Sequence, residues 1–163
     1  MMPFVQSTTS SKIEVTHVLI DSTKPFANVQ AYLEALIPPI DPEVYPLRPG
    51  MSDLKQRLEA LPELVVLAKR DHGLLLGIYG QPRHAVQYEI GNPLTASTMT
   101  RYGLAASLYA PLRVVLYEND SGGSCFEYDL PSSLFGQFGD DRITGVARGL
   151  DNALHRTLTA AAE

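Results

Sequence analysis

The chain has 163 residues, of which 45% are hydrophobic and 19% are charged, and its net charge is −5 at pH 7. That length suffices for one domain that buries about 70% of its unfolded surface without a disulfide. The acidic balance, with 13 basic residues and no cluster of them, argues against nucleic acid or an anionic membrane as the main partner. No secretory signal or membrane-length apolar run is visible, so we expect a cytoplasmic protein.

The first third of the chain predicts a tail, a strand and a helix. Residues 1–11 are polar and without pattern, which is typical of a flexible N-terminal tail, so we expect a single domain over residues 12–163. Apolar residues indicate a strand over residues 13–20. Helical spacing of apolar residues predicts a helix over 24–37, with capping oxygens supplied by residues 21–23.

Prolines dominate the segment 38–50 and exclude regular structure there. Long loops of this kind are often functional. The loop therefore either closes over a site or is an insertion without such a role, and the sequence does not choose between the two.

The second half predicts a short helix, a series of strands, another helix, a hairpin and a long final helix. We expect the strands at 64–67, 74–79, 85–90, 112–118 and 124–129, and the helices near 52–61, at 92–102 and from Ile143 onward. Cys125, the only cysteine, lies in a predicted strand and is expected to be a reduced packing residue. These elements indicate an α+β fold with a mostly antiparallel sheet.

From Asp71 to its end the sequence resembles the family called domain of unknown function 302 (DUF302). The resemblance rests on Asp71-His72-Gly73, Tyr88-Glu89-Ile90-Gly91-Asn92-Pro93, Ala110-Pro111-Leu112-Arg113-Val114-Val115, Tyr117-Glu118, Tyr128-Asp129-Leu130-Pro131-Ser132-Ser133, Gly136-Gln137-Phe138, Val146-Ala147 and Leu150-Asp151. It implies a curved, mostly antiparallel sheet with two main helices packed on one face, a topology similar to that of TATA-binding-protein-like domains. It also implies a homodimer, and it supplies no activity, cofactor or catalytic residue.

Arg113 is the first candidate site residue. Alternation along 112–118 places Leu112, Val114 and Leu116 on one face and Arg113 and Tyr117 on the other. An arginine in a central strand is costly to bury unpaired. We therefore expect either an ion pair with one of the nearby carboxylates or a contact with an anionic ligand. The candidate carboxylates are Glu89, Glu127 and Asp129.

Two predicted helix starts could also hold a ligand. Asn92 precedes Pro93, and Ser132 follows Asp129 at the end of a strand. The side chains can simply cap these helices. Alternatively, the free N–H groups beside them could bind a small anionic or carbonyl compound, provided that the two starts lie close together.

His72 is the best candidate for acid–base chemistry, because Asp71 beside it could tune the imidazole. The alternative is a solvated turn residue. No metal-binding spacing, phosphate-binding loop or nucleophile motif is present, so we expect neither a metal nor a cofactor.

Tyrosines are concentrated in the second half, and several could line one open face of the sheet. The first hypothesis is a small-molecule-binding domain, for an anionic or aromatic ligand, in a pocket on that face. Its residues would be Arg113, Tyr117, Tyr88, Tyr128, Asn92, Asp129, Ser132 and His72. The second is an acid–base enzyme on the same pocket, using His72 or Asp129. The third is a structural or protein-interaction module in which the tyrosine face is a dimer interface.

Overall fold

The structure is a computed structural model that describes residues 6–163, and in it a five-stranded antiparallel sheet carries helices on one face. The strands are β1 (His17–Ser22), β2 (Val65–Asp71), β3 (Ala85–Gly91), β4 (Leu112–Glu118) and β5 (Ser124–Asp129). Their order across the sheet is β1-β5-β4-β3-β2. The α+β class expected from the sequence is confirmed.

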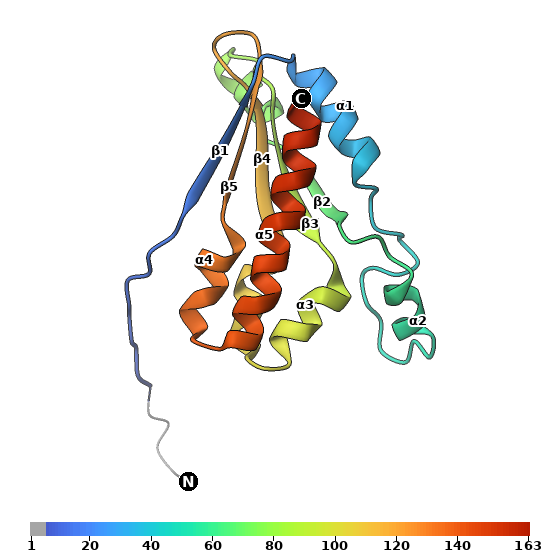
Figure 1. Cartoon of the computed structure of the whole chain (residues 1–163). Coiled ribbons are helices and arrows are strands. Elements are labelled where there is room, and N and C mark those ends of the chain that lie inside the picture. Colours follow the sequence, from blue (N-terminus) through green and yellow to red (C-terminus); the bar gives the residue numbers. More distant parts are fainter. Residues whose placement is uncertain (1–5) are drawn as a thin grey trace.

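The helices differ greatly in length. The α-helices are α1 (Phe26–Leu36), α2 (Leu54–Glu59), α3 (Pro93–Thr100), α4 (Pro131–Phe135) and α5 (Asp141–Ala162), and the 3-10 helices are η1 (Leu74–Tyr79), η2 (Leu104–Tyr109) and η3 (Gly136–Phe138). α5 runs lengthwise over the sheet beside α1 (Figure 1). No helix within residues 6–163 is long and apolar enough to cross a membrane.

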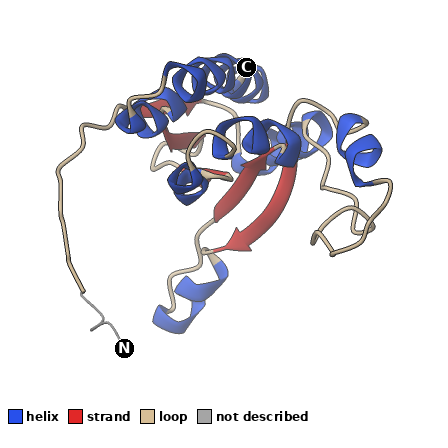
Figure 2. Ribbon diagram, turned by 90° about the horizontal axis from the view of Figure 1, so that it is seen from below, coloured by secondary structure: helices blue, strands red, loops and turns tan. Residues whose placement is uncertain are grey.

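Strict alternation divides the sheet into a helix-covered face and an open face. On β4, Leu112, Val114 and Leu116 are buried, whereas Arg113 is exposed. The register pairs Leu116 with Val86 of β3 and Phe126 of β5, so the same parity is buried across three strands. Figure 2 shows α5 and α1 on one side of the strands, while η1 stands apart from this helix layer at the end of its hairpin.

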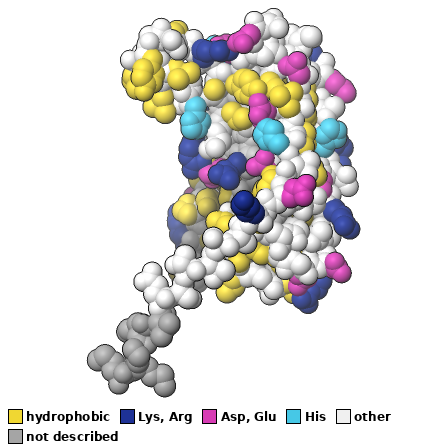
Figure 3. Space-filling view, turned by 90° about the vertical axis from the view of Figure 1, so that its left-hand side faces the viewer, with side chains coloured by type: hydrophobic (Ala, Val, Ile, Leu, Met, Phe, Trp, Pro, Cys, Tyr) yellow, Lys and Arg dark blue, Asp and Glu magenta, His cyan; other side chains and the backbone are white. Residues whose placement is uncertain are grey.

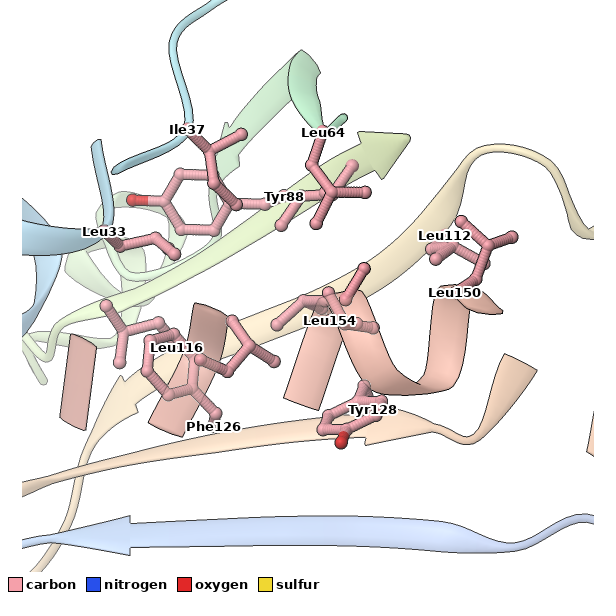
Figure 4. Packing of buried hydrophobic residues seen from close by; sticks show 14 of the residues in the cluster. Leu33, Ile37, Leu64, Tyr88, Leu112, Leu116, Phe126, Tyr128, Leu150 and Leu154 are labelled. Atoms are coloured by element: carbon pink, nitrogen blue, oxygen red, sulfur yellow. The ribbon is translucent and has the colours of Figure 1, made fainter. Parts of the chain in front are cut away.

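The main core lies between this sheet face and α5. The buried residues of α5 recur at spacings of three and four: Ile143, Ala147, Leu150, Ala153, Leu154, Leu158 and Ala161. In Figure 4, Leu150 and Leu154 extend toward the side chains of β4 and β5, among them Leu112 and Phe126. Leu154 has no exposed surface, which makes it a central contact between the helix and the sheet.

A second hydrophobic cluster forms where the proline-rich loop meets the edge of the sheet. Ile40 and Val44 of the loop pack with Leu58 of α2 and Val65 of β2. The loop is tied to β2 by backbone hydrogen bonds, because Val66 N–H donates to Pro38 and Ile40 N–H donates to Val66. The pairing of β2 with β3 shifts at Leu67, which is the extra residue of a bulge.

Most predicted elements are present, and three local predictions are wrong. The strand expected over residues 13–20 begins only at His17. Residues 74–79 form the 3-10 helix η1 instead of a strand, since Asp71 Oδ1 accepts a hydrogen bond from the Leu74 N–H and starts a helical turn. At Gly73, a Cβ would lie 2.0 Å from the carbonyl oxygen of Arg83, so only glycine permits this hairpin geometry. Helix α1 has no side-chain cap, because Ser22 Oγ accepts from Lys24 N–H before the helix begins.

We predict that Leu154→Ala lowers the free energy of unfolding by about 2–5 kcal/mol, because it leaves a cavity between α5 and the sheet. Leu104→Ala is the matched control, since Leu104 is 83% exposed, and it should change stability by less than about 0.5 kcal/mol. Urea denaturation monitored by circular dichroism measures both. Equal losses in the two variants would contradict the position assigned to α5.

Candidate functional site

An apolar cavity of about 320 Å³ lies where the two hydrophobic clusters meet. We call it the α3 cavity. Its lining residues come from the proline-rich loop, β2, the ends of β3 and β4, α3, α4 and α5: Tyr45, Leu47, Leu67, Ile90, Gly91, Asn92, Pro93, Thr95, Ala96, Ser97, Met99, Thr100, Ala110, Pro111, Leu112, Phe135 and Leu150. None of these residues carries a charge, so the cavity suits a neutral guest better than an ion.

The start of α3 shapes one wall of the α3 cavity. Asn92 is the N-cap, and its Oδ1 accepts hydrogen bonds from the N–H groups of Leu94 and Thr95 at 2.9 and 3.2 Å. Its Nδ2 donates to the carbonyl of Pro62 at 2.9 Å. The capping alternative for Asn92 is therefore the one that the structure supports, and both ends of its amide are already engaged.

Hydroxyl groups supply the polar part of the α3 cavity. Ser97 Oγ donates to the Leu94 carbonyl at 2.6 Å. The side chains of Thr95 and Thr100 also line the cavity, and their hydroxyls have no hydrogen-bond partner within residues 6–163. These two threonines are the available anchors for a polar group on a guest, and the sequence analysis did not single them out.

A second hollow, of about 360 Å³, lies between α1 and β2 around Tyr88. The buried Tyr88 hydroxyl donates to Glu34 Oε1 at 2.7 Å, and Lys69 Nζ donates to the same oxygen at 2.5 Å. Gln30 Nε2 donates to both Tyr88 and Glu34 at 3.2 Å. The network satisfies a tyrosine hydroxyl that the core would otherwise leave without a partner.

The electrostatics of this network keep Glu34 ionised and Tyr88 neutral. Burial raises the pKa of Tyr88, and the hydrogen bond to Glu34 raises it further. Burial opposes ionisation of Glu34, but hydrogen bonds from Lys69 and Tyr88 outweigh it and lower the pKa of that carboxyl. Glu34 therefore suits an ion pair with Lys69. It is poorly suited to exchange a proton with Tyr88.

A polar network occupies the open face near the β1 edge. His17 lies between two carboxylates, with Nδ1 2.9 Å from Asp129 Oδ1 and Nε2 2.7 Å from Glu127 Oε2. Tyr117 donates its hydroxyl to the other oxygen of Glu127. Histidine and acidic side chains lie next to one another on this side of the molecule (Figure 3).

Hydrogen bonds shift the titration of this open-face network. The hydrogen bonds to Asp129 and then Glu127 raise the pKa of His17. The hydrogen bonds from Tyr117 and then His17 lower the pKa of Glu127. His17 lies within the strand expected over residues 13–20, but the local sequence does not reveal its carboxylate partners, because they lie more than 100 residues away.

Arg113 lies on the open face as expected, but it forms no ion pair with any residue of the described chain, 6–163. Each carboxylate proposed as its partner is engaged elsewhere. Glu89 pairs with Arg70 at 2.5 Å, whereas Glu127 and Asp129 flank His17. The expected structural ion pair is therefore wrong, and the exposed guanidinium is solvated.

The predicted tyrosine pocket is also wrong, because its members lie on opposite faces. Tyr88 and Tyr128 are 0% and 3% exposed and point into the helix-covered core, as Figure 4 shows, whereas Tyr117 and Arg113 lie on the open face. Tyr128 OH is 3.5 Å from His155 Nδ1 on α5. The register decides this, since Tyr128 pairs with the buried Val114.

The remaining predicted residues also lie apart. Ser132 N–H donates to Asp151 Oδ1 at 2.8 Å, so a carboxylate of α5 already occupies the start of α4. His72 is an exposed turn residue at the end of β2. Asp129 pairs with His17 on the open face. Across residues 6–163, no group of three His, Cys, Asp or Glu side chains is arranged to hold a metal ion.

Comparison with known proteins places this arrangement in a family. The family model described as domain of unknown function DUF302 matches residues 50–161. The chain belongs to the DUF302 family. A crystal structure of an uncharacterized conserved DUF302 protein from Bacillus stearothermophilus is similar in fold, with a TM-score of 0.61 and 19% sequence identity over 90% of this chain and 94% of that one. No curated protein is significantly similar to this chain.

The family match includes most of the α3 cavity lining but not the N-terminal part of the chain. It begins at Gly50, the last residue of the proline-rich loop, so Tyr45 and Leu47 of the α3 cavity and His17 of the open face lie outside it. The remaining walls of the α3 cavity, from Leu67 to Leu150, lie inside the family match. The cover of the cavity is thus contributed by a part of the chain that the family model does not describe.

We predict that His17→Gln destabilises the protein more at about pH 5.5 than at about pH 8.5. The folded pKa of His17 is raised above 6.5, so the contribution of the protonated imidazole is fully present below that value and is lost as pH rises through the folded pKa. The His17 side chain is 55% exposed, which limits the difference to less than about 1 kcal/mol. Urea denaturation at both pH values measures it. His72→Gln, at a position with no ion pair in the described chain, is the control, and a pH-independent effect of His17→Gln would refute the role of the two carboxylates.

Arg113→Leu should change the free energy of unfolding by less than about 0.5 kcal/mol, because no carboxylate loses its partner. Arg70→Leu breaks the ion pair with Glu89 and serves as the comparison, with an expected loss of about 0.2–1 kcal/mol. Chemical denaturation distinguishes the two. A loss of about 3–5 kcal/mol for Arg113→Leu would instead show that Arg113 neutralises a buried carboxylate.

Proposed function

We propose that this DUF302 protein binds a small, neutral and predominantly apolar molecule in the α3 cavity. The observation that carries the proposal is an uncharged space of about 320 Å³ at the junction of two packed clusters. The space opens to solvent and has an apolar lining, and concave pockets of about 300–1,000 Å³ lined mainly by hydrophobic side chains are typical of small-molecule sites.

The lining of the α3 cavity defines the chemical class of the ligand. Aliphatic, aromatic and proline side chains make most of the wall, so a charged group inside it would lose its hydration without gaining a partner. The volume is about twice the 150 Å³ of an engineered cavity that binds benzene. An aromatic compound or a medium-length acyl chain fits these limits, with one hydroxyl or carbonyl anchored by Thr95 or Thr100.

The proline-rich loop supplies the entrance. Tyr45 and Leu47 line the α3 cavity and are still 40% and 47% exposed, so they lie between the cavity and solvent. The loop is fixed to β2 at Pro38 and Ile40, whereas Tyr45 and Leu47 lie beyond this attachment. The sequence left two roles open for this loop: it closes over a site, or it is an insertion without such a role. The proposal adopts the first role.

A thermal-shift measurement with indole, p-cresol and 1-octanol tests the proposal. A ligand at one hundred times its dissociation constant adds about 2.7 kcal/mol of stability, which raises the melting temperature of a protein of this size by about 5–11 °C. We expect such a rise for at least one of the three probes and none for benzoate or octanoate used as charged analogues.

Variants of two alanines make the test specific. Ala96→Leu adds aliphatic volume to the cavity wall and should abolish the rise in melting temperature. Ala31→Leu makes the same change on the exposed side of α1, away from the cavity, and should leave the rise intact. If both variants respond like the parent, or no neutral probe gives a rise, the α3 cavity is not the binding site.

A further inference from the structure

The N-terminal arm, residues 6–16, extends away from the body of the protein (Figure 1). All of its residues are exposed, and residues 6–15 make no hydrogen bond within the described chain. The arm is attached only at its end, where Thr16 N–H donates to Ser133 Oγ and the Thr16 carbonyl accepts from Leu130 N–H. An open hollow of about 490 Å³ lies between residues 11–14 and Ser133, Gly136 and Gln137.

The arm continues directly into β1, which is an edge strand of the sheet. Thr16 directs both of its backbone groups inward, toward β5 and α4. Because backbone direction alternates along a strand, His17, Leu19 and Asp21 direct their N–H and C=O groups outward. No described residue of this chain lies beyond β1 to pair with them, and such an edge is a template for another strand.

The side chains of the arm and of β1 form a pattern that a solvated tail would not need. Ile13, Val15 and Leu19 are 40%, 37% and 56% exposed, and their odd positions place them on one face of a continuous extended segment. Lys12 and Glu14 lie on the opposite face, two residues apart. The charges are therefore arranged symmetrically about Ile13.

We propose that two copies of this chain pair antiparallel through their N-terminal arms, with the two-fold axis at Ile13. This pairing places Lys12 of each copy opposite Glu14 of the other, which is the arrangement in which cross-strand charges stabilise a sheet. It also lays residues 7–11 of one copy along the outward groups of residues 15–19 of the other. Each arm then adds a strand to the edge of the other copy's sheet.

A second copy fits this edge because an antiparallel pair of identical strands is self-complementary, which a two-fold interface requires. The same charge pattern disfavours registers shifted by two residues, which would leave Lys12 and Glu14 without these partners. The segment precedes residues 50–161, so the proposal concerns a part of the chain that the family model does not include. It is independent of the ligand proposed for the α3 cavity.

Sedimentation velocity of the full chain over a range of concentrations tests the pairing. We expect a reversible dimer that Ser11→Pro weakens by about tenfold or more, because Ser11 would donate its N–H to the other copy and proline has none. Ser10→Pro is the matched control: Ser10 is also an exposed serine, but its N–H would point away from the other copy. Both variants should retain the circular dichroism spectrum of the parent, since neither residue makes a hydrogen bond to the folded body.

Charge exchange tests the register. Lys12→Glu and Glu14→Lys should each weaken the dimer, and the double variant should restore it, because every cross-strand pair is again of opposite charge. A monomer at all concentrations, or a dimer that responds equally to Ser10→Pro and Ser11→Pro, would overturn the proposal. Growth into larger assemblies with concentration would replace it with head-to-tail contacts.

Discussion

The structure depends on burying, beneath α5, the alternate residues of β3, β4 and β5 that face the helices. Leu116 lies between Val86 and Phe126 in the register, and the three side chains meet α5 and α1 on the same face. Because a strand alternates strictly, burying these residues forces the intervening ones onto the opposite face. Tyr117 and Glu127 therefore face away from the helices, and their pairing with His17 is a consequence of how the core packs.

The α3 cavity arises where this regular packing ends. β3 stops at Gly91, Asn92 caps α3, and α3 together with Leu150 of α5 walls the space beyond that end of the sheet. The second cluster fills only the side near β2, where the bulge at Leu67 lets the loop join. The space between the clusters is thus bounded largely by elements fixed for other reasons, whereas Tyr45, Leu47, Ala110 and Pro111 belong to irregular backbone. The proposed ligand would enter past Tyr45 and Leu47, the partly exposed loop residues of this lining.

Strong local patterns made much of this fold predictable. Strands 112–118 and 124–129 and the final helix follow from alternation and helical spacing, which need no knowledge of partners. The tyrosine face was predictable in part, since Tyr88 alternates with Val86 and Ile90 and so shares their buried side. In contrast, the run from Leu74 to Tyr79 has no alternation, and its helical turn depends on the Asp71 side chain. The α3 cavity and the partners of His17 arise from contacts between distant segments, which periodicity does not encode.

The two edge strands of the sheet, β2 and β1, differ in how their unpaired backbone groups are covered. At β2, the loop covers the edge through hydrogen bonds between Val66 and both Pro38 and Ile40. At β1, no described segment of the same chain provides such cover, and the preceding arm carries alternating apolar and charged residues. An uncovered edge with an apolar stripe favours indiscriminate aggregation. Lys12 and Glu14 counter this, because opposite charges two residues apart favour one antiparallel register over its neighbours. In the proposed pairing this charge pattern selects a strand of the same sequence, in the way that charged positions select partners in other strand and helix pairings.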